Sequence, residues 1–340
     1  MKYKRPTVVV SCRVHPEVLD RLGETCDVLP NDSTEALTSE ELGRRCRKAQ
    51  ALMAFMPERI DDDLLATCPD LRIVACALKG YDNFDVEACT RRGVWLTIVP
   101  DLLTAPTAEL TIGLMIALAR NILPGDRLLR DGAFRGWRPI LYGEGLDGGT
   151  VGLVGAGAVG KALARRLAGF RATLLYTDTQ PLAPDEEDAL RLRRLSRDAL
   201  LAQSDFVVLC LPLLPATRHL VNAEFLARMQ PSAFLVNTAR GSLVDEAAVA
   251  DALESGHLGG YAADVFAMED WALPERPREV SARLLASGRT VLTPHLGSAV
   301  DGVRREIALA AATSILEALR GELPSGAVNR PRRPRGGAAP

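Results

Sequence analysis

Short apolar runs alternate with amphipathic stretches along the first hundred residues of the chain. Four runs rich in apolar and β-branched residues predict strands, at residues 7–11, 51–55, 72–76 and 93–98. Polar and apolar positions recur at helical spacing over Pro16–Leu22 and Ser39–Ala49, and Ser39 is the expected N-cap of the second helix. Because strands alternate with helices, the pattern predicts an α/β domain with a parallel sheet.

A second α/β series begins near residue 150, after a long apolar helix. Pro100 and Asp101 interrupt the first series, and a helix is expected from Thr104 to about Ala119. That helix is apolar nearly all round, so we expect it to be buried against several neighbours, a second copy of the chain among them. Six later runs predict strands, at residues 151–154, 173–176, 206–210, 234–237, 260–263 and 290–292. A helical segment after Ala299 leads toward the C-terminus.

The composition argues against several classes of protein. The 340 residues are 47% hydrophobic and carry a net charge of −2, which disfavours disorder, nucleic-acid binding and polybasic membrane binding. The longest apolar stretch, residues 110–119, is shorter than the roughly 20 residues of a membrane span. The N-terminus lacks the apolar region of a secretory signal. The seven cysteines are scattered and never spaced as CxxC, so we expect a cytoplasmic protein with reduced thiols and no metal site.

A glycine-rich loop follows the strand predicted at residues 151–154. Gly155-Ala156-Gly157-Ala158-Val159-Gly160 has the form GxGxxG and opens a helix predicted over Lys161–Gly169, and Asp178 ends the next predicted strand. Such glycines let the backbone approach a pyrophosphate, and the helix N-terminus stabilises it. An acid after the second strand accepts hydrogen bonds from the adenosine ribose and repels a 2′-phosphate. The segment therefore predicts NAD as the cofactor, in preference to NADP.

Together these patterns predict an α/β fold with two domains. We expect a Rossmann-type, doubly wound dinucleotide-binding domain inserted in a smaller, flavodoxin-like α/β substrate domain, with the substrate in the cleft between them. The predicted boundaries are 1–102 for the first part of the substrate domain, 103–299 for the NAD-binding domain, 300–325 for the return segment and 326–340 for a basic tail. The last residues, RPRRPRGGAAP from Arg330, favour disorder, with an anion clamp as the alternative.

Polar residues also follow three of the later predicted strands, where an open α/β sheet binds its ligands. The segments are Asn237-Thr238-Ala239-Arg240-Gly241, Asp264-Val265-Phe266-Ala267-Met268-Glu269 and Thr293-Pro294-His295. An Arg offers a fork for two anion oxygens, and a carboxylate beside a His orients the ring and favours imidazolium. Asp264 is expected at the cofactor.

The set GxGxxG, acid, NxxRG, DVFxxE and PHxG resembles the NAD-dependent D-2-hydroxyacid dehydrogenase superfamily over residues 7–325. This resemblance implies that Arg240 binds the substrate anion, that His295 is the acid–base group and that Glu269 holds His295. It also supports a homodimer. No role for a metal is implied.

Within that superfamily the sequence is most similar to the phosphonate dehydrogenases, which oxidise phosphite to phosphate. The similarity is close over residues 75–85, which contain Lys79, and at Glu269-Asp270-Trp271, where most hydroxyacid members have Glu-Pro. Lys79 adds a second cation, which suits phosphite because that anion lies between its singly and doubly charged forms at neutral pH. The same resemblance assigns five residues to the substrate pocket: Met56, Trp137, Tyr142, Ser298 and Arg304.

The sequence therefore predicts NAD-dependent oxidation of phosphite. Water attacks phosphorus, His295 takes the proton of the water, and hydride passes to NAD; Arg240 and Lys79 are the alternatives to His295 as the base. A D-2-hydroxyacid dehydrogenase of the glyoxylate or hydroxypyruvate reductase type is the second hypothesis, with His295 acting on the substrate hydroxyl. An NAD-sensing scaffold without turnover is the third, which the intact set of Arg240, Glu269 and His295 disfavours.

Overall fold

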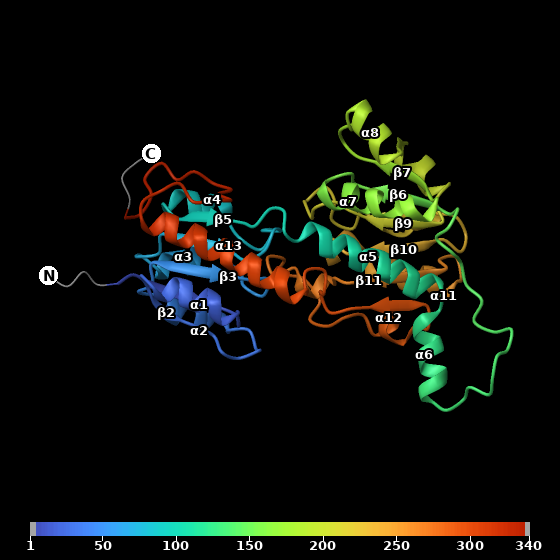
Figure 1. Ribbon diagram of the computed structural model, residues 1–340, viewed down its shortest axis with the longest axis horizontal. Helices are drawn as coiled ribbons and strands as arrows, with labels where there is room; N and C mark the ends of the chain where they lie inside the picture. Colours follow the sequence, from blue (N-terminus) through green and yellow to red (C-terminus); the bar gives the residue numbers. More distant parts are fainter. Residues whose placement is uncertain (1–4, 337–340) are drawn as a thin grey trace. The chain divides into compact units, whose positions relative to one another are not determined.

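The computed structural model describes residues 5–336, and these form two compact units, each built on a parallel sheet (Figure 1). Unit 1 consists of the chain up to Leu103, Trp271–Pro274 and the chain from Ala299 onward. Unit 2 consists of Thr104–Asp270 and Glu275–Ser298. The predicted α/β class is confirmed. Residues 271–274 belong to unit 1, although the predicted boundaries placed them in the NAD-binding domain.

Unit 1 has a five-stranded parallel sheet in the order β2-β1-β3-β4-β5. The strands are β1 Thr7–Val10, β2 Asp27–Leu29, β3 Ala51–Ala54, β4 Ile73–Cys76 and β5 Trp95–Thr97. The helices are α1 Pro16–Gly23, α2 Ser39–Cys46, α3 Asp62–Thr67, α4 Val86–Arg91 and α13 Asp301–Leu319. Successive strand residues point to opposite faces, so Val8 and Val10 pack with α1 and α13 while Val9 packs with α2.

Two local predictions for unit 1 need correction. The N-cap of α2 is Thr38 and not Ser39, because the Thr38 hydroxyl accepts the N–H of Glu41 at 3.2 Å. The helix ends at Cys46 and not Ala49, since a turn there returns the chain to β3. The sequence pattern also missed β2, a short edge strand with too few buried residues to show apolar alternation.

The C-terminal segment packs on the edge strand of unit 1. The N–H of Ile98 donates to Gly326 and that of Val328 to Leu96, each at 2.9 Å, so the segment pairs with β5 and the residues beside it. Further on, the guanidinium of Arg335 donates to the carbonyl oxygens of Cys68 at 2.7 Å and Leu71 at 3.3 Å. Arg335 is therefore held on unit 1 by hydrogen bonds, contrary to the disorder predicted for this tail. The predicted tail beyond residue 336 lies outside the described residues.

Unit 2 has a seven-stranded parallel sheet in the order β12-β11-β10-β9-β6-β7-β8. The strands are β6 Thr150–Val154, β7 Thr173–Thr177, β8 Leu192–Arg194, β9 Phe206–Leu209, β10 Phe234–Asn237, β11 Gly260–Ala263 and β12 Thr290–Leu292. The chain proceeds outward from β6 to β8 and then returns to β9 on the other side of β6. Doubly wound sheets bind their ligands at such a reversal of strand order, so the carboxyl end of β6 is the expected binding position.

Helices cover both faces of the unit 2 sheet (Figure 1). The helices are α5 Thr104–Ala119, α6 Ile122–Arg130, α7 Ala158–Leu167, α8 Pro184–Leu190, α9 Arg197–Leu201, α10 Ala223–Ala227, α11 Glu246–Glu254 and α12 Ala282–Ala286, with 3₁₀ turns η1 Ala168–Phe170, η2 Gly241–Leu243 and η3 Ala267–Glu269. Helix α5 has its predicted bounds and packs on α7, β10, β11 and β12, which confirms its burial against several neighbours. None of the helices in the described part of the chain has the length and apolarity needed to cross a membrane.

Candidate active site

The glycine loop of unit 2 has the backbone geometry that a dinucleotide needs. Gly155 has a φ of +100°, and a Cβ there would lie 2.5 Å from the carbonyl oxygen of Cys210. A Cβ at Gly160 would lie 2.6 Å from the carbonyl oxygen of Gly155, so this residue keeps helix and loop close. At Gly157, which caps α7, no atom of the described residues lies within 4 Å of the Cβ position. The open backbone at the start of α7 therefore fits a pyrophosphate.

Asp178 lies directly after β7 and is tied to the same loop. Its carboxylate accepts the N–H of Ala156 at 2.8 Å and the hydroxyl of Thr179 at 3.2 Å. Burial raises the pKa of Asp178, but the hydrogen bonds from Ala156, Gln180 and Thr179 outweigh burial and lower the pKa overall. The carboxylate is therefore ionised at neutral pH, which fits the ribose end of NAD.

The structure brings His295 and Glu269 into direct contact. Nδ1 of His295 lies 2.6 Å from Oε2 of Glu269, and Oε1 of Glu269 accepts the N–H of Phe266 at 2.7 Å. Both side chains are partly exposed. Because Glu269 occupies Nδ1, Nε2 is the ring nitrogen that faces away from the carboxylate. The pair can therefore exchange a proton with a substrate through Nε2.

A buried carboxylate organises the turn that carries His295. Asp264, 1% exposed, accepts the Thr293 hydroxyl at 2.6 Å and the backbone N–H groups of Leu296 and Gly297, each at 2.7 Å. Burial raises the pKa of Asp264 in spite of these hydrogen bonds. His295 itself has a φ of +57°, an uncommon conformation for a residue with a side chain, which the turn maintains. Asp264, predicted at the cofactor, thus supports the turn through both carboxylate oxygens.

Arg240 lies on a loop shaped by a buried amide. The side chain of Asn237 donates to the carbonyl oxygen of Arg240 at 2.8 Å and accepts the N–H of Ala239 at 3.0 Å. One guanidinium N–H of Arg240 donates to the Ala239 carbonyl at 2.8 Å. The sequence motif included Asn237 but assigned it no role, and the signal available was a polar residue at the end of an otherwise apolar strand.

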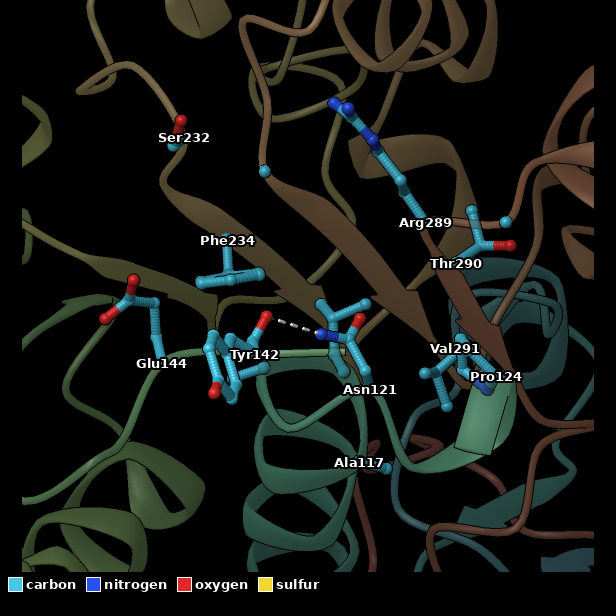
Figure 2. Close-up of a pocket in the computed structure, with 15 residues that line it drawn as sticks. Ala117, Asn121, Pro124, Tyr142, Glu144, Ser232, Phe234, Arg289, Thr290 and Val291 are labelled. Carbon is cyan, nitrogen blue, oxygen red and sulfur yellow. Dashed lines mark hydrogen bonds between the residues drawn. The ribbon is translucent and has the colours of Figure 1, made fainter. Parts of the chain in front are cut away.

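Trp137 and Tyr142 lie on the segment of residues 131–145, which follows α6. Thr107, in the first turn of α5, donates to the carbonyl of Gly297 at 3.4 Å, so the His295 turn adjoins the start of this 16-residue helix. Tyr142 instead lines a cavity of about 310 Å³ at the end of the helix, beside Asn121 (Figure 2). A helix of that length spans about 24 Å. Within the chain, Tyr142 therefore lies at the opposite end of α5 from the His295 turn.

Met56, Lys79 and Arg304 belong to unit 1, at or near the carboxyl ends of its strands. The Arg304 guanidinium donates to the Ala77 carbonyl at 3.4 Å and lies over the Phe55 ring, 5.7 Å from its centroid. Burial lowers the pKa of Arg304. Met56 follows β3, and Lys79 is a half-buried residue of the loop after β4.

Two further features complete the description of the candidate site. Ser298, the last residue of unit 2, follows the turn held by Asp264 and is half-buried. Among the described residues, no group of three or more His, Cys, Asp and Glu side chains is arranged to hold a metal ion.

Comparisons with known proteins agree with this geometry. A family model described as the NAD binding domain of D-isomer specific 2-hydroxyacid dehydrogenase matches residues 112–297. A glyoxylate reductase of Thermofilum pendens is 37% identical over 330 residues, which cover 96% of this chain and 95% of that relative. A glyoxylate reductase of Pyrococcus furiosus is 36% identical, with 96% of each chain covered.

A solved structure of a related reductase also resembles this chain. The NADPH-dependent glyoxylate/hydroxypyruvate reductase of Sinorhizobium meliloti, in complex with NADP and malonate, superposes with a TM-score of 0.80 at 30% identity, covering 96% of this chain and 97% of that one. These relatives are named glyoxylate reductases and not phosphonate dehydrogenases. They therefore favour the hydroxyacid hypothesis over the narrower resemblance drawn from Lys79 and the Glu269-Asp270-Trp271 segment.

Proposed function

The chain belongs to the D-isomer specific 2-hydroxyacid dehydrogenase family, and from that premise we propose that it reduces a small 2-oxoacid of the glyoxylate or hydroxypyruvate type with NADH. The observation that carries the proposal is the 2.6 Å contact between Nδ1 of His295 and Glu269. Relatives named glyoxylate reductase, at 36–37% identity over almost the whole chain, support the choice of substrate class.

Each residue of the proposed site has a distinct task. The guanidinium of Arg240 binds the two carboxylate oxygens of the substrate and orients its carbonyl group. Nε2 of His295 donates a proton to the carbonyl oxygen, and Glu269 orients the ring through Nδ1. The loop from Gly155 to Gly160 and Asp178 hold NAD, which supplies the hydride chemistry when bound.

The direct test is oxidation of NADH by the purified protein with glyoxylate and with hydroxypyruvate. We expect turnover with both substrates and a higher kcat/KM with NADH than with NADPH. An Arg240→Ala variant should raise KM for glyoxylate while NADH binding is preserved. Absence of NADH oxidation with either substrate in a folded, NADH-binding protein would refute the proposal.

Oxidation of phosphite is the second candidate, because Lys79 and Arg304 of unit 1 are cations in addition to Arg240. In this reaction phosphite, water and NAD give phosphate, NADH and a proton, with His295 taking the proton of the attacking water. Formation of NADH from NAD and phosphite tests it, and Lys79→Ala should then weaken phosphite affinity strongly. Turnover of phosphite alone would replace the 2-oxoacid proposal, and turnover of neither substrate would favour an NAD-binding scaffold.

We also propose that the protein forms a homodimer. Large exposed apolar side chains gather on α6 and the segment after it, namely Ile122, Leu129, Phe134, Trp137, Ile140, Leu141 and Tyr142. Such a concentration of exposed apolar surface is typical of a protein interface. Sedimentation equilibrium should give twice the chain mass, and a monomer at all concentrations tested would contradict the dimer.

A further inference from the structure

Two adjacent carboxylates in and after the η3 turn contact different parts of the site. Glu269 holds His295, as described above. Asp270 is 2% exposed, and its Oδ2 accepts the backbone N–H of Ser242 at 2.8 Å. Ser242 lies in η2, the turn that directly follows Arg240. The carboxylate of Asp270 therefore joins the segment that carries Glu269 to the segment that carries Arg240.

The two turns are also in close backbone contact. A Cβ at Gly241 would lie 1.8 Å from the carbonyl carbon of Phe266 and 2.1 Å from the nitrogen of Ala267. Only glycine permits this approach. Glu246, at the start of α11, accepts the N–H of Ala267 at 3.0 Å and so fixes the η3 turn from the other side. With η3 held in this way, the hydrogen bond from Ser242 to Asp270 fixes η2 relative to Glu269.

The guanidinium of Arg276 lies near the buried carboxylate of Asp270 and offsets part of the cost of burying it. The guanidinium of Arg276 donates to the carbonyl oxygen of Met268 at 2.6 Å, within the same turn. Burial lowers the pKa of Arg276, and the charge of Asp270 acts on it in the opposite direction. The two side chains are thus close enough to interact. A buried carboxylate with a hydrogen-bond donor and a counter-charge is a stable anchor.

We propose that Asp270 is a positioning residue that sets the guanidinium of Arg240 relative to the imidazole of His295. Asp270 acts through the Ser242 N–H and does not touch the reacting atoms. A proline at this position, as in the Glu-Pro sequence noted above, has no side-chain acceptor and cannot make this contact. The proposal rests on the proposed function, in which Arg240 binds the substrate carboxylate.

Kinetics of Asp270 variants test the proposal. Asp270→Ala removes the acceptor, and we expect KM for glyoxylate to rise about 10- to 100-fold because the anion site is displaced, with KM for NADH changed less than about twofold. Asp270→Asn keeps an oxygen that can accept the Ser242 N–H and should restore most of the affinity. In an Arg240→Ala background, Asp270→Ala should have little further effect on KM, since the anion-binding side chain is already absent.

Asp245→Ala is the matched control. Asp245 lies three residues after Ser242, and its carboxylate accepts the N–H groups of Ala247 and Ala248 at the start of α11. Removing it destabilises the same region without releasing Ser242, so thermal stability should fall while the ratio of the two KM values stays unchanged. If KM for glyoxylate and for NADH rise together in Asp270→Ala, or if the control shows the same split, the positioning role is wrong.

Two measurements keep this proposal separable from the proposed function. Hydrogen exchange at the Ser242 amide should accelerate in Asp270→Ala and remain slow in Asp270→Asn, whatever the substrate. Oxalate, a small dicarboxylate probe, should bind the NADH-loaded Asp270→Ala protein about 10- to 100-fold more weakly than wild type in calorimetry. If the wild type binds oxalate but does not oxidise NADH, and Asp270→Ala still shows the faster exchange and the weaker oxalate binding, only the proposed function fails. Unchanged exchange at Ser242, or unchanged oxalate affinity in Asp270→Ala, would overturn the positioning role.

Discussion

The turns that carry Glu269 and His295 differ sharply from the segment of residues 131–145 in the same unit. In the catalytic turns, the carboxylates of Glu269 and Asp264 accept the backbone N–H groups of Phe266, Leu296 and Gly297. In the segment, Trp137 is 82% exposed and Tyr142 75% exposed. The end of the segment is held by Asn121, the residue before α6, whose side chain donates to the carbonyl oxygens of Leu141 and Tyr142 at 3.4 and 3.1 Å.

The difference shows how far the conformation of a site residue is fixed by the residues around it. The catalytic turns follow strand ends, so the sheet places them and local carboxylates hold them in one conformation. Exposed aromatic side chains on a long segment have no such constraint within the chain. The first region is therefore held in one conformation, whereas the second exposes apolar side chains that the proposed dimer would cover.

The largest effect should come from removing the acid–base group of the first region. His295→Asn leaves Nε2 without a replacement, and we expect kcat for glyoxylate reduction to fall about 10²- to 10⁴-fold. NADH binding, followed by fluorescence titration, should remain within about twofold of wild type because the residue serves proton transfer. Retention of more than a tenth of the wild-type kcat would exclude His295 as the acid.

A smaller effect should follow from weakening the support beneath His295. Thr293→Val removes the hydroxyl that donates to Asp264, and the loss of this buried bond should lower the free energy of unfolding by about 1–3 kcal/mol. Thr290→Val is the matched control, because the Thr290 hydroxyl donates at the opposite end of β12, to Leu284 and Ser287. The kcat for glyoxylate reduction should fall more in Thr293→Val than in this control. A larger loss of kcat in Thr290→Val would contradict the supporting role of Thr293 beneath His295.

The same variant has a pH signature. Burial raises the pKa of Asp264 in the folded chain, so the folded state holds a proton that the unfolded state has released. The free energy of unfolding therefore falls as pH rises from the ordinary carboxyl range through the raised pKa. The Thr293 hydrogen bond lowers this pKa, so Thr293→Val should extend the fall to higher pH. Urea denaturation between pH 4 and 8 measures the slope, and parallel curves for variant and wild type would contradict the linkage.

Much of the fold followed from apolar periodicity, and two of the exceptions have different causes. Helix α5 and strands β10, β11 and β12 have their predicted bounds, because most of their apolar side chains are buried. The edge strand β8 was missed, since two of its three residues are exposed. Helix α6 was missed because Pro124 and Gly125 interrupt its pattern near the start.

The residues of the candidate site also fall into two groups, those that the sequence identified and those that it could not. Strand-end motifs and the family resemblance identified Arg240, Glu269 and His295, and the structure brings the last two together. The support beneath them could not be predicted. Which backbone N–H faces Asp264 or Asp270 depends on how separate strands lie beside one another, and no spacing within the sequence records that.

A third prediction concerns cofactor choice, which depends on a carboxylate held as firmly as those of the catalytic turns. Asp178→Ala should lower the preference for NADH over NADPH about tenfold, since one charged hydrogen bond to the ribose is lost and repulsion of a 2′-phosphate ends. Asp205→Ala is the control, because Asp205 accepts the N–H of Thr150 at the opposite end of β6. Dissociation constants for both cofactors measure the ratio, and an unaltered ratio would remove Asp178 from the ribose site.

The smallest effect on stability should come from the second region. Trp137→Ala removes a largely exposed side chain, so the free energy of unfolding of the single chain should change by less than about 0.5 kcal/mol. Phe206→Ala is the contrast, because Phe206 is buried and stacks on Phe234 at 5.1 Å, and its loss should cost about 3–5 kcal/mol. Since Trp137 belongs to the proposed interface, its loss should instead raise the dimer dissociation constant in sedimentation at micromolar concentrations. A Trp137 variant that unfolds early but still dimerises like wild type would mean that this segment supports its own chain, and the contrast between the two regions would fail.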